Sequence, residues 1–408
     1  MNILLYANAF IPKIDGICFR LVQFLDFVDI NYPDINIILV TPYPFCNNKY
    51  KRFKIYNSYG KRLDFACKDN SKIYYIPTKN FRKFKDYLDD IIFLNNIDII
   101  HIFQGDITTG LILELSKKFN IPVVYSWHTH IHEYLKKYNY NLILIKLLQI
   151  FYKFSMFNYC DYFWSVSKSA EENLINNNLL LTTKRNILPP FVCTKTFYPI
   201  KKKINNKFTL LYVGRITREK NIDFIINFIN NNKNYNLIIV GDGCYKDNLV
   251  QLAISLNLNN NIEFVGQVDR NNLYKYYNKV DCFIQASKTE TMGFVTLEAM
   301  ACKTPVIGFN DCGTKDIIKH NETGYLFNNE NELLNSLNLI KDNRDRIVNN
   351  AYNYVKLLTI DNYCKTNLDL YNFLIKNKKK QKLFDKLIFN IRLFLYNVFI
   401  LILWIFNY

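Results

Sequence analysis

Short runs of apolar residues alternate with longer segments of mixed character along most of the chain. The runs are NILLYA, INIILVTP, IDIIHIF and IPVVYSW in the first half, and FTLLYVG, YNLIIVG, NIEFVG, VDCFIQAS and TPVIGF in the second. Runs that are apolar on both faces of the strand are typical of parallel sheets covered on both sides. The helix-length segments between them supply the crossovers that parallel strands require. The pattern therefore predicts an α/β protein.

The alternation breaks once, over residues 188–207, where LPPFVCTKTFYPIKKKINNK brings in prolines and lysines. On each side of this linker a strand-like run leads directly into a loop, as ILLYANAFIPKIDG and LLYVGRITREKN. We therefore expect two doubly wound domains, residues 1–195 and residues 196–375. Ligands of such sheets bind outside the carboxyl ends of the strands, so we expect the domains to face one another across a cleft.

Residues 376–408 differ from the rest, because a lysine block, KNKKKQK, precedes a nearly unbroken apolar end. A helix over residues 387–406 would be about 30 Å long, which is enough to cross the hydrocarbon layer of a membrane. Asn390, Arg392 and Asn397 interrupt its apolar surface. We predict a membrane-associating tail that either spans the bilayer or lies at its surface; packing against the protein itself is the alternative.

Composition and charge narrow the classes of protein. The chain has 408 residues, half of them hydrophobic, which indicates a globular protein with sizeable cores rather than a disordered one. The formal net charge of +17 favours an anionic partner, such as a membrane surface, a nucleic acid or a phosphorylated substrate. The opening MNILLYANAF lacks the basic region and cleavage site of a signal peptide, so we expect a first strand and a cytoplasmic protein.

Two glutamates eight positions apart suggest a binding site for a sugar nucleotide. The stretch KTETMGFVTLEAMA reads as the exit loop of a strand followed by the start of a helix. Backbone N–H groups near Gly293, Phe294 and Val295 would lack helical partners and are suited to phosphate oxygens. Carboxylates at Glu290 and Glu298 would accept hydrogen bonds from sugar hydroxyls. A solvated loop acid and an ordinary helix glutamate are the structural alternative.

A second loop, in LYVGRITREKNIDFII, has the charges that a diphosphate needs. The strand is predicted to end at Gly214, and Arg215 and Lys220 follow in a loop that leads into a helix. A guanidinium and an ammonium near a helix start suit a diphosphate, whose charge grows as its bond to a sugar breaks.

Together with GDGCYKDNL and IEFVGQVDRNNLYKYY, these stretches resemble the donor-binding domain of the retaining GT-B glycosyltransferases, the glycosyl transferases of group 1. The resemblance extends over roughly residues 1–375 and implies a GT-B fold. It implies that Arg215 and Lys220 hold the donor diphosphate. It also implies that Glu290 contacts the transferred sugar and that Glu298 holds the ribose.

The resemblance also assigns residues of the N-terminal half. Gly16, in PKIDGICFRL, matches a loop glycine that lets the diphosphate approach the backbone, and an ordinary turn glycine is the alternative. His128, in SWHTHIHEYL, matches the acceptor-side wall, where it would stabilise developing charge. Three departures from the family pattern, Met292, Lys303 and Cys312, affect the expected shape of the pocket rather than its chemistry.

We predict neither a metal nor a cofactor. Histidines at 128, 130 and 132 alternate as metal ligands can, but only His101 and His320 remain to complete such a site. The chain has no Asp-x-Asp pair to hold a metal-bridged diphosphate and no GxGxxG after a strand to bind a dinucleotide. His130 and His132 receive no role.

Three features favour a lipid acceptor. Residues 134–160 contain four lysines and no acid, and Lys146, Gln149 and Lys153 form a thin polar stripe suited to anionic headgroups or, equally, to a buried helix. The second feature is the basic and apolar tail. The third is HTHIHEYL, which resembles a segment of glycosyltransferases that act on diacylglycerol.

Our hypothesis is a diacylglycerol α-glucosyltransferase that uses UDP-glucose at the cytoplasmic face of the cell membrane. The enzymatic alternative is a transferase of surface polysaccharide or of another lipid-linked glycan. A nucleic-acid-binding protein is the alternative from another class, but the basic residues lack the interleaved aromatic residues of known nucleic-acid modules, so we expect no nucleic-acid partner.

Overall fold

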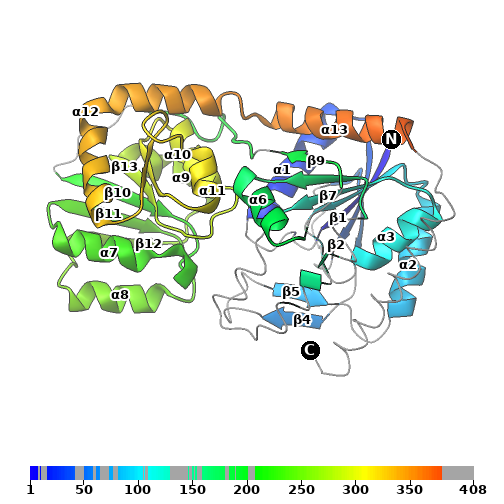
Figure 1. Cartoon of the computed structure of the whole chain (residues 1–408), viewed down its shortest axis with the longest axis horizontal. Helices are drawn as coiled ribbons and strands as arrows, with labels where there is room; N and C mark the ends of the chain where they lie inside the picture. The colour runs from blue at the N-terminus through cyan, green and yellow to red at the C-terminus, as the bar shows by residue number, and fades with distance from the viewer. Residues whose placement is uncertain are drawn as a thin grey trace. The chain divides into compact units, whose positions relative to one another are not determined.

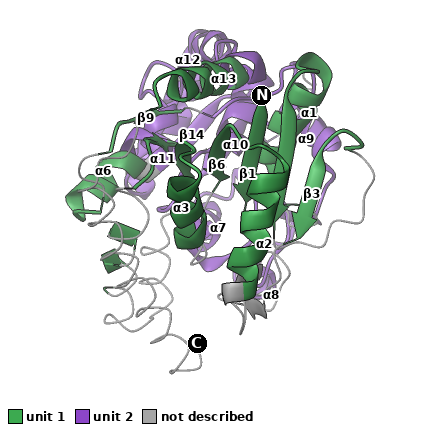
Figure 2. Cartoon of the chain, turned by 90° about the vertical axis from the view of Figure 1, so that its right-hand side faces the viewer, with its two compact units in different colours: residues 1–166, 170–188, 364–408 green, residues 167–169, 189–363 purple. Residues whose placement is uncertain are grey.

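The apolar runs form strands in both halves of the chain, as predicted. In the computed structural model the chain divides into two units (Figures 1 and 2). Unit 1 comprises residues 1–166, 170–188 and 364–408, and unit 2 comprises residues 167–169 and 189–363. The structure describes residues 1–7, 10, 16–41, 50–57, 61–64, 73–76, 81–103, 105, 109–128, 146, 149–150, 152–153, 159–179, 183–188, 190–200 and 207–378.

Unit 1 contains, within its described residues, a seven-stranded parallel sheet of order β3-β2-β1-β6-β7-β8-β9. The strands are β1 (Asn2–Ala7), β2 (Asn36–Thr41), β3 (Lys54–Asn57), β6 (Ile99–Phe103), β7 (Val123–Trp127), β8 (Tyr162–Ser165) and β9 (Arg185–Ile187). A separate antiparallel pair consists of β4 (Lys61–Asp64) and β5 (Ile73–Ile76). The helices are α1 (Gly16–Asn31), α2 (Phe81–Leu94), α3 (Thr109–Lys118) and α6 (Lys168–Asn176).

Helices cover both faces of this sheet, because successive side chains of a strand point to opposite sides. On one face, Leu88 of α2 and Leu115 of α3 belong to a buried cluster with Ile100 of β6. On the other face α1 packs, since the ring of Phe24 lies 6.1 Å from that of Phe103, between centroids. The continuous apolar runs of the sequence follow from this double burial.

The chain returns to unit 1 at its described end, which the sequence pattern did not indicate. Helix α13 (Ile360–Lys376) begins in unit 2 and continues in unit 1 (Figure 2). Its Tyr371 is fully buried, and the hydroxyl of Tyr371 hydrogen-bonds Nδ1 of His101 on β6. Nε2 of His101 lies 2.7 Å from Oγ of Ser126 on β7, so the helix is tied to two neighbouring strands.

Unit 2 contains, within its described part, a six-stranded parallel sheet of order β12-β11-β10-β13-β14-β15. The strands are β10 (Phe208–Val213), β11 (Tyr235–Val240), β12 (Ile262–Gly266), β13 (Cys282–Gln285), β14 (Val306–Phe309) and β15 (Tyr325–Phe327). The connecting helices are η3 (Arg218–Lys220), α7 (Ile222–Asn231), α8 (Lys246–Ser255), η4 (Arg270–Asn272), α9 (Leu273–Lys279), α10 (Phe294–Ala301), α11 (Cys312–Ile317) and α12 (Glu330–Val355).

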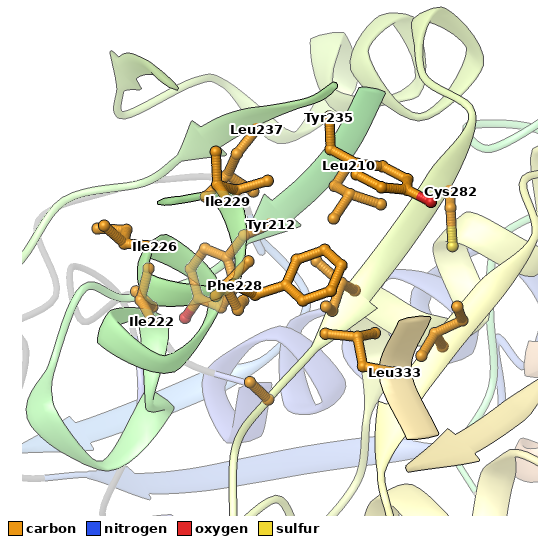
Figure 3. Close-up of a cluster of buried hydrophobic side chains, with 14 of the residues drawn as sticks. Leu210, Tyr212, Ile222, Ile226, Phe228, Ile229, Tyr235, Leu237, Cys282 and Leu333 are labelled. Atoms are coloured by element: carbon orange, nitrogen blue, oxygen red, sulfur yellow. The ribbon is translucent and has the colours of Figure 1, made fainter. Parts of the chain in front are cut away.

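The alternation along β10 shows how this second sheet is covered. Leu210 and Tyr212 point toward α7 and α12 and pack in one cluster with Phe228 and Leu333 (Figure 3). The intervening Leu211 belongs to the opposite cluster, with residues of α9 and α10. Both faces are therefore buried, and the loops at the carboxyl ends of the strands carry the polar residues.

Several predicted features lie outside the described residues. These are the tail beyond residue 378, most of residues 134–160, and the histidines at 130 and 132. Among the helices that are described, none combines the length and the hydropathy needed to cross a bilayer.

Candidate functional site

Backbone contacts join the loops at the carboxyl ends of β10 and β11. The N–H of Gly214 donates to the carbonyl of Val240 at 3.0 Å, and the N–H of Ile216 donates to the carbonyl of Asp242 at 2.8 Å. A Cβ at Gly241 would lie 1.9 Å from the carbonyl oxygen of Gly214, so only glycine permits this approach. The sequence used GDGCYKDNL only as support for the resemblance; in the structure its GDG segment positions the loop of Arg215.

Lys220 and Glu290 form the centre of the site. Nζ of Lys220 lies 2.9 Å from Oε2 of Glu290, and the two side chains are 12% and 15% exposed. Nε2 of Gln285, at the end of β13, donates to the same oxygen at 3.3 Å. The other oxygen, Oε1, accepts from the backbone N–H groups of Thr291 at 3.2 Å and Gly293 at 3.3 Å. The glutamate is thus held by its own loop and by a lysine from another strand's loop.

These contacts keep Glu290 ionised. Burial by itself raises the pKa of its carboxyl, but the charge and hydrogen bond of Lys220 and the N–H groups of Gly293 and Thr291 outweigh burial. The pKa of Glu290 therefore lies below its ordinary value. A fixed, ionised carboxylate can accept hydrogen bonds from sugar hydroxyls.

Tyr212 connects this pair to the loop of Arg215. Its hydroxyl donates to the carbonyl of Arg215 at 2.8 Å. Burial is the main reason why the pKa of Tyr212 is raised; Glu290 raises it further, whereas the charges of Lys220 and Arg215 lower it. The tyrosine therefore stays neutral, and its electrostatic environment includes three of the charged residues that the sequence selected, namely Arg215, Lys220 and Glu290.

Helix α10 begins beside Glu290. Gly293, its N-cap, has a φ of 54°, a left-handed conformation that suits glycine, and a Cβ there would lie 2.5 Å from Cδ1 of Ile317. The first N–H groups of a helix have no carbonyl partner within it, and those of Phe294 and Val295 occupy these positions. Together with the positive end of the helix dipole, they are suited to bind phosphate oxygens, and their binding of the donor stays a prediction.

Glu298 has a different environment from Glu290. It lies one turn inside α10, and its side chain is 1% exposed. Its Oε1 forms an ion pair with Nη2 of Arg270, and its Oε2 accepts a hydrogen bond of 2.9 Å from the hydroxyl of Tyr277. Burial raises the pKa of Glu298, although Arg270 and Tyr277 act in the opposite direction.

The departures from the family pattern have local explanations. The backbone N–H of Gly313 donates to the carbonyl of Glu290 at 2.8 Å, so the glycine after Cys312 is the one that meets the site. Met292 is 5% exposed, so this apolar side chain is buried. Lys303 has a φ of 55°, the conformation for which the family commonly uses glycine.

Several residues that the sequence did not single out belong to this site, namely Tyr212, Gln285, Tyr277 and Arg270. Tyr212 and Gln285 lie in strand-like runs, where periodicity predicts only burial. Arg270 and Tyr277 are in IEFVGQVDRNNLYKYY, whose order supported the resemblance without indicating which side chains turn inward.

Two predicted site residues belong to unit 1. Gly16 is the first residue of α1. His128 follows β7 directly, is 1% exposed, and stacks on Phe103 with 5.9 Å between ring centroids. Burial, and then the charge of Arg20 and the neighbouring His101, hold the pKa of His128 well below its ordinary value, so its imidazole is neutral near pH 7. In the described ranges, no group of three or more His, Cys, Asp or Glu side chains is arranged as a metal site.

Comparison with protein families matches both halves of the chain. The model described as "Glycosyl transferases group 1" covers residues 194–354, and the model described as "Glycosyltransferase Family 4" covers residues 61–195. Together they span most of the chain and include the loops of Lys220 and Glu290. The chain belongs to the group 1 glycosyltransferases, as the resemblance in the sequence predicted.

Two curated relatives are named for the synthesis of a glucosyldiacylglycerol, and a third is named for the transfer of a sulfoquinovosyl group. The chain is 27% identical to an alpha-monoglucosyldiacylglycerol synthase of Acholeplasma laidlawii, over 93% of this chain and 99% of that protein. It is 25% identical to the synthase of the same name from Streptococcus pneumoniae, over 76% of this chain and 68% of that protein. It is 27% identical to the sulfoquinovosyl transferase SQD2 of Arabidopsis thaliana, over 57% of this chain and about half, 47%, of that protein.

Solved structures agree on the architecture. A sucrose-phosphate synthase from Thermosynechococcus elongatus superposes with a TM-score of 0.73 at 19% identity, over 92% of this chain and 99% of that one. Anabaena HepE in complex with UDP superposes with a TM-score of 0.71 at 15% identity, over 92% of this chain and 100% of that one. At these identities the likeness concerns the fold alone, which is the predicted GT-B fold of two parallel-sheet domains.

Proposed function

We propose that this chain is a retaining glycosyltransferase that moves glucose from UDP-glucose to diacylglycerol or a related membrane lipid. The observation that supports a nucleotide-sugar donor is the ion pair of Lys220 and Glu290 beside the start of α10. It places a cation for phosphate and a carboxylate for sugar hydroxyls next to one another, and the backbone N–H groups of the helix start lie beside them. A sugar diphosphate needs these three elements together.

The donor diphosphate would be bound by Arg215, Lys220 and the N–H groups of Phe294 and Val295. Negative charge grows on the diphosphate as its bond to the sugar breaks, so fixed positive groups stabilise the transition state more than the bound donor. The proposed mechanism therefore needs no metal. Gly16, in unit 1, is proposed to let a donor phosphate approach the backbone at the start of α1.

The transferred sugar would be oriented by Glu290, whose carboxylate is held ionised by its surroundings. The acceptor hydroxyl would attack the anomeric carbon on the side from which the nucleotide leaves. The bond from that carbon to the phosphate oxygen breaks, and the acceptor proton passes to the departing phosphate oxygen. His128, as a neutral imidazole, is proposed to hydrogen-bond the reacting sugar on the acceptor side.

The lipid acceptor is supported by the relatives and by the charge of the chain. Two of the proteins described above are named alpha-monoglucosyldiacylglycerol synthases, and one of them aligns along nearly its whole length. The net charge of +17 and the lysine block before the apolar tail favour an anionic membrane surface. We propose that the enzyme is peripheral or tail-anchored at the cytoplasmic face of the cell membrane.

The direct test incubates the purified full chain with detergent-dispersed diacylglycerol and a panel of labelled nucleotide sugars. We expect a glucolipid from UDP-glucose, an α-linkage by NMR, and equal rates with and without EDTA. A β-linked product would refute retention, and loss of activity in EDTA with recovery in Mg²⁺ or Mn²⁺ would refute the metal-free mechanism. Transfer only to glycan acceptors would instead favour surface polysaccharide assembly. Salt-dependent nucleic-acid binding without sugar transfer would overturn the enzymatic proposal.

A further inference from the structure

Arg270 covers the more deeply buried of the two site carboxylates. It begins η4, after β12, and its guanidinium forms an ion pair with Oε1 of Glu298. The side chain of Arg270 is 23% exposed, whereas that of Glu298 is 1% exposed. The guanidinium carbon also lies 5.1 Å from the ring centroid of Phe197, which is fully buried. Arg270 is therefore fixed from two sides and is the member of the pair that reaches the surface.

Tyr277 fixes the other oxygen of the same carboxylate. Its hydroxyl donates to Oε2 of Glu298 at 2.9 Å, and it is fully buried in α9. An ionised carboxylate has about four acceptor positions on its two oxygens, so the ion pair on Oε1 and the hydrogen bond on Oε2 do not fill all of them. The two donors set the plane and the charge of the group without exhausting it.

We propose that Arg270 is a positioning residue for nucleotide recognition, which clamps Glu298 against Tyr277 so that its remaining lone pairs receive the ribose hydroxyls of a nucleoside diphosphate. This role rests on the proposed function, transfer from a nucleotide sugar, and on the ribose contact that the family resemblance implies for Glu298. A buried carboxylate without its cation tends to become protonated, and a protonated carboxyl is a weaker and differently oriented acceptor. An arginine suits the task, since its planar fork holds a carboxylate in one orientation.

The test compares the dissociation constants of UDP with those of its 2′-deoxy and 3′-deoxy analogues. In the unmodified protein, at least one missing hydroxyl should weaken binding about tenfold or more, as expected for a hydrogen bond to a charged group. In Arg270→Leu the ratio of the dissociation constant of the deoxy analogue to that of UDP should fall toward one, because Glu298 no longer holds its orientation. A ratio of two ligands cancels a general loss of folded protein.

Arg270→Lys supplies a second variant that retains the positive charge. It should keep the fold while reducing the deoxy penalty only partly, since an ammonium lacks the planar fork. Arg344→Leu is the matched control: Arg344 is also partly buried in unit 2, and its Nη1 donates to the carbonyl of Asp281 at 3.1 Å, before β13 begins. The control should leave the ratio unchanged.

Three results would overturn this role. An unchanged ratio in Arg270→Leu together with a lower Tm would make the ion pair purely structural. Tighter UDP binding by Arg270→Leu than by the unmodified protein would mean that Arg270 competes with the ribose. If the unmodified protein bound neither UDP nor any other nucleoside diphosphate, the proposed function would fail as well, and this outcome is distinct from the first two.

Discussion

Nζ of Lys220 lies 2.9 Å from Oε2 of Glu290, although 70 residues separate them in the chain. The lysine comes from the loop after β10 and the glutamate from the loop after β13, and these two strands are neighbours in the sheet. A cation for phosphate and a carboxylate for sugar hydroxyls are thereby kept in contact. The charge and hydrogen bond of Lys220 help to keep Glu290 ionised.

Replacing Glu290 by glutamine should cripple transfer while the protein stays folded. Glutamine has the same shape but lacks the charge that orients the sugar, so we expect kcat to fall by about 100-fold or more. Steady-state assays at saturating donor would measure the change, with circular dichroism to verify folding. The control Glu322→Gln removes a mostly exposed carboxylate in the same unit and should leave kcat unchanged. Near-normal turnover of Glu290→Gln would refute the role of this residue.

Replacing Lys220 by methionine should change the pH profile as well as the rate. With Lys220 present, the pKa of Glu290 is lowered, so the carboxylate stays ionised as the pH falls to its ordinary pKa. Without the ammonium, burial dominates and raises that pKa, so the variant should lose activity at a higher pH than the unmodified enzyme does. Measuring kcat/KM from about pH 5 to pH 8 tests this shift of the acidic limb. If the acidic limb of the pH profile of kcat/KM were identical in both proteins, Glu290 would not titrate in this range.

Replacing Lys303 by glycine should stabilise unit 2. The left-handed backbone at Lys303 costs a side-chain-bearing residue about 1 kcal/mol, which glycine avoids. Nζ of Lys303 lies 3.3 Å from Oδ1 of Asn349 and 4.9 Å from the ring centroid of Tyr352. These contacts offset only part of this cost. We expect Tm to rise by about 2 °C in a thermal melt. Lys356→Gly is the matched control, because Nζ of Lys356 also lies over the ring of Tyr352, 4.5 Å from its centroid. Lys356 has a φ of −60°, so its replacement by glycine relieves no strain and should lower Tm.

Deleting residues 379–408 should weaken membrane binding and leave donor binding intact. Each lysine near an anionic leaflet contributes about 1 kcal/mol of attraction, and the apolar residues add a term that salt does not screen. Co-sedimentation with vesicles containing anionic lipid, at low and high salt, would measure the loss, and UDP binding would serve as the control. Neutralising the tail lysines alone should give a partial, salt-dependent defect. A truncated protein that still sedimented fully at high salt would move the anchor to residues 134–160, and loss of UDP binding would indicate that the tail belongs to the folded core.

Local sequence pattern was sufficient for the architecture of each sheet. Strands buried on both faces must be apolar at successive positions, and parallel strands must be separated by crossovers, so both properties are visible along the chain. The site loops were predictable for the same reason, because they directly follow strands. Arg215, Lys220, Glu290 and the start of α10 are therefore candidates that the sequence alone indicates.

Only the tertiary structure decided which of these groups meet. Spacing alone gives Glu290 and Glu298 the same chemistry, yet the first is kept ionised by Lys220 and backbone N–H groups, whereas the second is enclosed by Arg270 and Tyr277. Spacing cannot distinguish them, since burial and partners depend on strand order and helix packing.

The return of α13 to unit 1 has the same origin. Tyr371 meets His101 across 270 residues of sequence, and no periodicity within either segment encodes that contact. The sequence by itself determined two covered parallel sheets and the loops at their strand ends, because those features follow from local patterns of burial. The partners of each charged side chain were decided by folding, because they come from loops and helices that only the packed sheets bring together.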